Sequence, residues 1–214
     1  LGLWAAGAMI FLAFHLVAHR RFCRRVLGAA RRDDLVAGGK VRVVESKAAD
    51  GPLAFGIFRR FVAFPCGFEE RFDATERALV LAHELGHHAR GDLIANWAAL
   101  AVLAAHWFNP IAWRAFRAFR ADQEMACDAL VLAGREAALR HAYGCAIVKS
   151  AHGGAISAAC HLHTIHDVKG RLRMLMILKA PSRARRRAGT AGAAMLALAA
   201  MGLTASAGVA ADHM

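Results

Sequence analysis

The segment LVLAHELGHHARGD, residues 79–92, decides how this sequence is interpreted. It places His83 and His87 four residues apart, with Glu84 directly after the first histidine. Residues four apart lie on one face of a helix, so both imidazoles can present a ring nitrogen to the same cation. A carboxylate beside them can accept a proton from a water held by that cation. The segment therefore predicts a metal site of the zinc peptidase type, provided that a third ligand exists.

The residues around this motif predict that it lies on a helix. Asp73 or Thr75 can cap the start of this helix, and Gly91 suits its end. Apolar residues occupy positions 79, 80, 81 and 85 between them. Both histidines therefore stand one turn apart on a single element.

A third ligand separates the classes of such sites. One class has a glycine three residues after the second histidine and a further histidine three residues beyond, but Arg90 and Leu93 occupy those positions here. The other class takes a glutamate from a later helix. The segment ADQEMACDALVL offers Glu124, and Asp128 lies one turn further on the same face. We predict that Glu124 binds the metal and that Asp128 accepts the second N–H of one motif histidine. Without the histidines, the same acidic pair would be interpreted as solvated surface.

Two further helices are predicted between the motif and Glu124. The first, which Asp92 can cap, is apolar nearly all round over residues 93–108 and ends at an Asn-Pro pair. The second begins near Ile111 and runs to Gly134. At about 1.5 Å per residue, the first carries the chain away by about 22 Å, and the path from Ile111 to Glu124 returns about 20 Å. An antiparallel hairpin therefore brings Glu124 back to the level of the motif.

A small sheet is expected before the motif. KVRVVES, residues 40–46, alternates and is rich in β-branched residues, which predicts a strand. Residues 53–65 predict one or two short strands closed by Pro65. We expect part of residues 53–64 to be an edge strand that lines the cleft and pairs with substrate backbone; the alternative is a buried strand that serves only as core. Together these elements predict an α+β fold, mostly helical, with a small sheet.

Two uncharged segments predict transmembrane helices, residues 1–19 and residues 188–211. Basic residues cluster next to both spans, and the side of the membrane with this excess is the cytoplasmic one. The clusters comprise Arg20, Arg21, Arg24, Arg25, Arg31 and Arg32 after the first span, and Lys179, Arg183, Arg185, Arg186 and Arg187 before the second. Residues 20–187 are therefore expected to form a cytoplasmic domain between two spans.

The composition bears on which classes of protein this chain can belong to. A net charge of +12 is typical of nucleic-acid-binding proteins, but no signature of a nucleic-acid-binding fold accompanies it, so direct nucleic-acid binding is not expected. The 57% hydrophobic content fits a protein that is partly in lipid. Five irregularly spaced cysteines fit reduced thiols in the cytosol better than a disulfide framework.

Other candidate residues have weaker patterns. CHLHTIH, residues 160–166, has metal-binding residue types but no partner pair of matching spacing. His88 is predicted to lie on the surface, away from the motif histidines, and Cys127 to be a small apolar filler. Tyr143 and His141 are the candidates for stabilising an oxyanion.

Three segments in this order resemble the BlaR/MecR-type membrane zinc metallopeptidase family. They are HELGHHARGDLIANW, HWFNPIAWRAFRAFRADQEMACDALVL and VKGRLRMLMILK, and the resemblance covers residues 51–179. It implies zinc bound by His83, His87 and Glu124, with Glu84 as base, in a gluzincin-like, and so zincin-like, metalloprotease domain.

The same resemblance implies a place and a substrate. The domain would face the cytoplasm between helices of a bacterial-type inner (cytoplasmic) membrane protein with several spans, and would cleave a cytosolic protein, a repressor-type regulator or itself. The sequence ends at Met214 without a penicillin-binding sensor domain, so a β-lactam role is not expected.

Two alternatives stay open. One is a membrane quality-control protease resembling the HtpX/Ste24 group, which shares the motif and a later Glu followed by Asp. The other is a non-catalytic membrane signalling protein with a structural metal site. Glu84 argues against the second, because a structural site needs no base.

Overall fold

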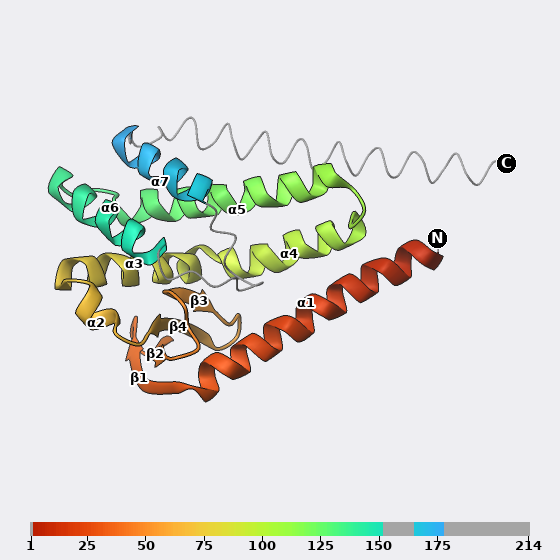
Figure 1. Cartoon of the computed structure of the whole chain (residues 1–214), viewed down its shortest axis with the longest axis horizontal. Helices are drawn as coiled ribbons and strands as arrows, with labels where there is room; N and C mark the ends of the chain where they lie inside the picture. The colour runs from red at the N-terminus through yellow and green to blue at the C-terminus, as the bar shows by residue number, and fades with distance from the viewer. Residues whose placement is uncertain (1, 152–164, 178–214) are drawn as a thin grey trace. The chain divides into compact units, whose positions relative to one another are not determined.

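The computed structural model describes residues 2–151 and 165–177, which are mostly helical with one small sheet (Figure 1). The elements are α1 (Gly2–Gly28), β1 (Ala30–Val36), β2 (Val41–Ser46), β3 (Leu53–Phe55), β4 (Arg60–Pro65), α2 (Phe68–Arg71), α3 (Ala74–Arg90), α4 (Asp92–Ala105), α5 (Pro110–Val131), α6 (Ala137–Ala151) and α7 (Ile165–Ile177). The expected α+β class is therefore confirmed.

The four strands form a mixed sheet in the order β1-β2-β4-β3. β2 is the strand predicted at residues 40–46, and the segment 53–65 yields both β3 and β4. β1 and β3 pair antiparallel with their neighbours, whereas β2 and β4 run parallel. β3 is therefore an edge strand, while β4 lies inside the sheet.

The other edge strand, β1, has no counterpart among the predicted elements. Its sequence ARRDDLV carries four charged residues in seven, so it shows no alternating apolar pattern. Charged side chains are common on edge strands, where they oppose pairing with another chain. A turn with positive φ at Ala37, Gly38 and Gly39 reverses the chain into β2.

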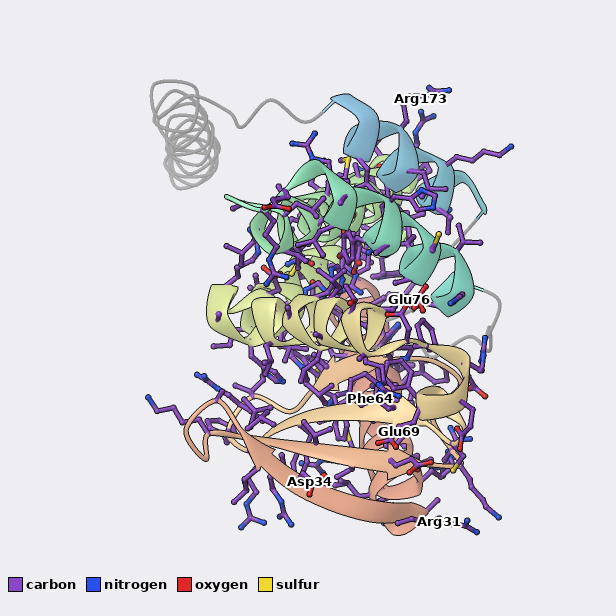
Figure 2. All side chains as sticks on the ribbon, turned by 90° about the vertical axis from the view of Figure 1, so that its left-hand side faces the viewer. Arg31, Asp34, Phe64, Glu69, Glu76 and Arg173 are labelled. Carbon is purple, nitrogen blue, oxygen red and sulfur yellow. The ribbon has the colours of Figure 1, made fainter. Side chains whose placement is uncertain are left out.

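Helix α3 lies between the sheet and a layer of helices that includes α6 and α7 (Figure 2). On the sheet side, Val80 belongs to a buried cluster with Val62 of β4. On the helix side, Leu79 belongs to another cluster with Val131 of α5 and Leu175 of α7. Packing on both sides fixes the orientation of α3 and of the side chains it carries.

His88 shows the effect of this packing. Only 7% of its surface is exposed, so the predicted surface position is wrong. Its Nε2 lies 2.9 Å from the carbonyl oxygen of Phe61, which can only accept, so the ring donates this hydrogen bond. The sheet covers this side of α3, and helical spacing alone does not reveal a covering sheet.

Both ends of α3 have the caps that the sequence indicates. The Asp73 carboxylate accepts from the Glu76 backbone N–H at 2.8 Å, and the Glu76 side chain accepts from the Asp73 N–H at 3.0 Å. Glu76 also pairs with Lys149 of α6 at 2.6 Å. Gly91, with φ of 74°, ends α3 in the left-handed conformation and also caps α4, so Asp92 is not the cap residue.

The predicted hairpin is formed by α4 and α5. The Asn109 side chain accepts from the backbone N–H of Ile111 at 2.9 Å, and Pro110 occupies the first position of α5. This cap starts α5 directly after the bend.

Helix α1 is the single helix within residues 2–151 and 165–177 that is long and apolar enough to cross a membrane. It continues past residue 19 to Gly28, and its last turns reach the sheet, where Val26 is fully buried. The rings of Phe22 and Phe55 make an edge contact there, with centroids 6.2 Å apart. The second predicted span, residues 188–211, lies outside the described residues.

Candidate metal centre

Three predicted ligands, His83, His87 and Glu124, meet between α3 and α5. The Nε2 atoms of the two histidines are 3.2 Å apart. The Glu124 carboxylate lies 3.2 Å from His83 Nε2 and 3.6 Å from His87 Nε2. Four ligands on zinc at about 2.0–2.2 Å would be about 3.3–3.6 Å from one another if tetrahedral. The three donors therefore have the spacing of three corners around one ion.

The contacts of each histidine on the side away from Glu124 show that its Nδ1 carries a hydrogen. The single hydroxyl proton of Tyr143 is donated to Asp128 Oδ1 at 2.7 Å, so the contact of 2.7 Å between this hydroxyl and His83 Nδ1 requires that Nδ1 donate. Asp128 Oδ1 also lies 3.2 Å from His83 Nδ1. His83 Nε2 is therefore the ring nitrogen that can bind a metal ion, once it releases its own proton.

His87 has a partner of the same kind. Its Nδ1 lies 2.9 Å from Asp92 Oδ2, and a carboxylate can only accept, so Nδ1 carries the hydrogen here too. Arg90 Nε donates to the same carboxylate at 3.1 Å. Asp92 was expected only as a helix cap; its true position behind a histidine follows from the sharp turn at Gly91.

This arrangement favours a cation. Two ring nitrogens and a carboxylate face one another, so positive charge between them, whether a proton or a metal ion, is favoured. Burial alone would lower the pKa of His83, but its bonds to Asp128 and Glu124 raise that pKa to about 9. Burial alone would raise the pKa of Glu124, yet His83 and Arg171 hold it well below the usual range. The residues present therefore fit a metal ion chemically as well as geometrically.

Arg171 of α7 holds the carboxylates from behind, and sequence reasoning missed it. It is 7% exposed, and its Nε and Nη2 donate to the two oxygens of Asp128 at 2.8 and 2.7 Å. Its Nη1 lies 3.4 Å from Glu124 Oε2. Such two-point pairing fixes the plane of a carboxylate. The sequence held one signal: Arg171 lies four residues before the apolar Leu175, and therefore on the same face of the helix. In the structure this face is buried, whereas Arg173 is exposed.

Glu84, the predicted base, is also buried, with 7% of its surface exposed. Burial raises its pKa above the ordinary carboxyl value, although the nearby charges of His83 and His87 oppose this. A carboxylate with a raised pKa is better matched to proton transfer near neutral pH.

Cys127 offers a competing donor. One ligand atom each from His83, His87 and Cys127 lie within 4.8 Å of one another. The Cys127 thiol, however, donates to the His83 carbonyl oxygen at 3.3 Å, and its Sγ lies where a Cβ on Gly86 would approach to 2.8 Å. Burial raises the pKa of this thiol, and a metal binds the thiolate form. The ionised Glu124 is therefore the better third donor, and Cys127 packs against the α3 backbone.

The two oxyanion candidates lie elsewhere. Tyr143 is 1% exposed and contacts the Nδ1 side of His83, behind the ligand atoms. Burial raises its pKa well above the ordinary value, so it stays protonated and acts as a hydrogen-bond donor. His141 is exposed on α6 and contacts Cys145. The segment 160–166 is outside the described residues except for its last two positions.

Comparison with known proteins identifies the family of this chain. Residues 1–175 match the family described as BlaR1 peptidase M56. The chain belongs to this family. It is 32% identical over 110 residues to the regulatory protein BlaR1 of Bacillus licheniformis, covering 51% of this chain and 18% of that protein. It is 23% identical over 194 residues to the methicillin resistance mecR1 protein of Staphylococcus aureus, covering 82% of this chain and 33% of that protein.

The chain thus spans between 18% and 33% of the length of these relatives. Membership of the M56 peptidase family supports a metallopeptidase-type role in membrane signalling.

Proposed function

We propose that this chain forms the zinc endopeptidase part of a membrane signalling protein, with a zincin-like domain built around α3. The observation that carries this proposal is the convergence of His83 Nε2, His87 Nε2 and the Glu124 carboxylate within 3.2 to 3.6 Å. These three side chains would hold Zn²⁺. Hydrogen bonds from His83 to the Tyr143 hydroxyl and from His87 to Asp92 support both rings, and Asp128 lies 3.2 Å from the same His83 nitrogen.

The remaining chemistry is divided among groups of the chain. Bound in this centre, zinc would supply Lewis acidity, which lowers the pKa of water to about 7 and polarises a peptide carbonyl. Glu84 would take the proton of the attacking water and deliver it to the leaving nitrogen. The burial that raises its pKa suits it to both transfers.

We propose a cytosolic protein as substrate, a repressor-type regulator or the chain itself. The edge position of β3, beside α3, supports binding of an extended peptide by main-chain hydrogen bonds. All three β3 side chains are buried, so β3 would pair with a peptide through its backbone edge and not through its side chains.

The membrane arrangement belongs to the same proposal. Residues 1–19 and 188–211 would be spans of an inner-membrane protein, with residues 20–187 in the cytoplasm. The apolar helix α1 and the basic residues that follow residue 19 support this orientation. The domain boundaries and the number of spans remain predictions.

The non-catalytic alternative differs from this proposal in the role of Glu84, and the quality-control alternative differs in the choice of substrate. A structural metal site needs no buried carboxylate beside its ligands, whereas Glu84 is 7% exposed and has a raised pKa. A quality-control protease would use the same centre on many unfolded membrane proteins rather than on one regulator.

The test compares Glu84→Gln with Glu70→Gln, a matched change at an exposed glutamate. Purified protein should hold about one zinc per chain in both variants, because neither changes a ligand. Peptide hydrolysis should fall by about 100-fold or more only in Glu84→Gln. Undiminished hydrolysis in Glu84→Gln would exclude it as the base.

The substrate is identified by sequencing new protein N-termini in cells that produce the intact chain or Glu84→Gln. One or a few cytosolic proteins cut only by the intact chain would support a regulator. Many cut membrane proteins would favour quality control, and no difference in any protein would favour the non-catalytic alternative.

A further inference from the structure

The bend between α4 and α5 carries large apolar side chains on its outside. Val102 is 62% exposed, Phe108 61% and Ile111 73%, and Trp107 between them is 38% exposed. Single exposed apolar residues are ordinary, but a group of four at one bend marks an interaction surface. We call residues 102–111 the hairpin tip.

Three backbone carbonyls of the hairpin tip accept hydrogen bonds from side-chain N–H groups. The carbonyl of Val102 contacts the His106 ring at 2.9 Å, and that of Trp107 accepts from the Trp113 indole at 2.8 Å. The Ala105 carbonyl accepts from the indole of Trp4 in α1 at 2.8 Å. Water would satisfy such carbonyls without help from the protein. In hydrocarbon, internal partners of this kind are required.

Helix α1 fixes the depth of the hairpin tip. A Cβ on Gly7 would come within 2.7 Å of the Trp107 ring, so the glycine makes room for that ring. The rings of Phe11 and Trp113 make an edge contact with centroids 5.6 Å apart. These α1 residues belong to its uncharged run, and Gly7 precedes Arg20, the first arginine, by thirteen residues. Along a helix this is about 20 Å, well inside a hydrocarbon core about 30 Å thick.

Helix α5 has a second, charged side. Arg114 and Arg117 follow the hairpin tip within two turns and are exposed. Arg117 precedes Glu124 by seven residues, so the two lie on nearly the same face. Charged side chains at membrane depth face water-filled space or a protein interior rather than lipid.

We propose that the hairpin tip is the one part of the otherwise cytoplasmic residues 20–187 that enters the lipid bilayer, where it lies beside α1, while the arginine side of α5 faces water. The acyl chains cover Val102, Trp107, Phe108 and Ile111. The hydrated arginine side leads along α5 toward Glu124.

The immersion has a consequence for substrate choice that rests on the proposed function. Glu124 lies thirteen residues after Ile111, about 20 Å down α5. The metal centre is then level with the cytoplasmic membrane surface, near Arg20. A peptide bond cleaved there lies in a segment close to the membrane.

Photo-crosslinking tests the immersion. The photoreactive residue benzoylphenylalanine replaces Phe108, Ile111, Arg117 or Leu130, one at a time, in the full chain in nanodiscs of phosphatidylethanolamine and phosphatidylglycerol. Leu130 is the matched control, since it is a 49% exposed apolar residue of α5 at the end away from the bend. Positions 108 and 111 should give about tenfold more phospholipid adduct than 130 and 117, because only they lie in hydrocarbon.

The other outcomes are decisive too. Adducts from positions 108 and 111 to a second copy, or to another segment of the same chain, would overturn the proposal, as would lipid yields equal to that of position 130. A high lipid yield at position 117 would overturn the hydrated arginine side. Melting temperatures of the substituted chains are compared with that of the unmodified chain to show that each is folded. Two positions, 108 and 111, are used so that the result does not depend on a single variant. None of these readouts depends on zinc or proteolysis, so failure of the proposed function would leave the result intact.

Discussion

The two ends of α5 differ in a way that inverts the usual pattern of a globular protein. At the end near the metal centre, the buried residues include polar ones: Gln123 is 6% exposed and Asp128 1%. At the hairpin tip, four of the exposed residues are large and apolar, with Ile111 at 73%. Buried charge is tolerated where each group has a partner, as Asp128 has in Arg171, Tyr143 and His83. Exposed apolar surface is tolerated where the surroundings are not water. One helix thus connects a paired ionic interior to a surface suited to lipid.

The largest effect is expected from the ligand itself. Glu124→Ala removes one of three donors and should lower the zinc content from about one per chain to near zero. The control is Asp122→Ala, an exposed acid two residues away, which should keep its zinc. Metal analysis of the purified variants measures both. Full retention in Glu124→Ala and also in His87→Ala would refute the assigned ligands.

The next effect concerns the ion pair behind the ligand. Arg171→Met leaves the carboxylates of Asp128 and Glu124 buried without their cation, and should lower the free energy of unfolding by about 3–5 kcal/mol. Arg173→Met changes an exposed arginine of the same helix and should cost less than about 0.5 kcal/mol. Denaturant titration of the metal-free protein in detergent compares them. Equal stability of the two variants would show that the buried pair contributes nothing.

A smaller effect is expected from the hydroxyl that orients His83. Tyr143→Phe removes the acceptor of Nδ1–H but leaves Asp128 at 3.2 Å from the same nitrogen. Zinc affinity should fall by about tenfold, the lower end of what supporting residues contribute. Competition with a chelator gives the affinity. An unchanged value would mean that Asp128 alone orients the ring.

The smallest effect on folding is expected at the other end of α5. Ile111→Ser in detergent should change the free energy of unfolding by less than about 0.5 kcal/mol, because its side chain is 73% exposed. Leu79→Ala, at a residue 1% exposed, should cost about 2–5 kcal/mol in the same assay. If Ile111→Ser costs as much as Leu79→Ala, the hairpin tip packs against protein, and the contrast between the two ends is lost.

The sequence by itself predicted the features that depend on neighbours along the chain. The helix of the motif, its capping residue Asp73 and the bend at Asn109 follow from local backbone hydrogen bonding. The meeting of Glu124 with the histidines followed from helix rise, because two antiparallel helices joined by a short bend must return to the same level. The α+β class followed from the strand and helix periodicities.

Tertiary structure alone decided the contacts that hold these residues in place. Arg171 reaches Asp128 across 43 residues, and Tyr143 reaches His83 across 60. His88 became buried because the sheet covers its side of α3. Cys127 is the small filler that the sequence predicted, but only the structure shows that Gly86 leaves room for its sulfur. Periodicity indicates which face of a helix is apolar, but not which element will cover that face. The partners of a buried polar group depend on how separate elements pack, so local sequence predicted the ligands and the packing selected the residues that orient them.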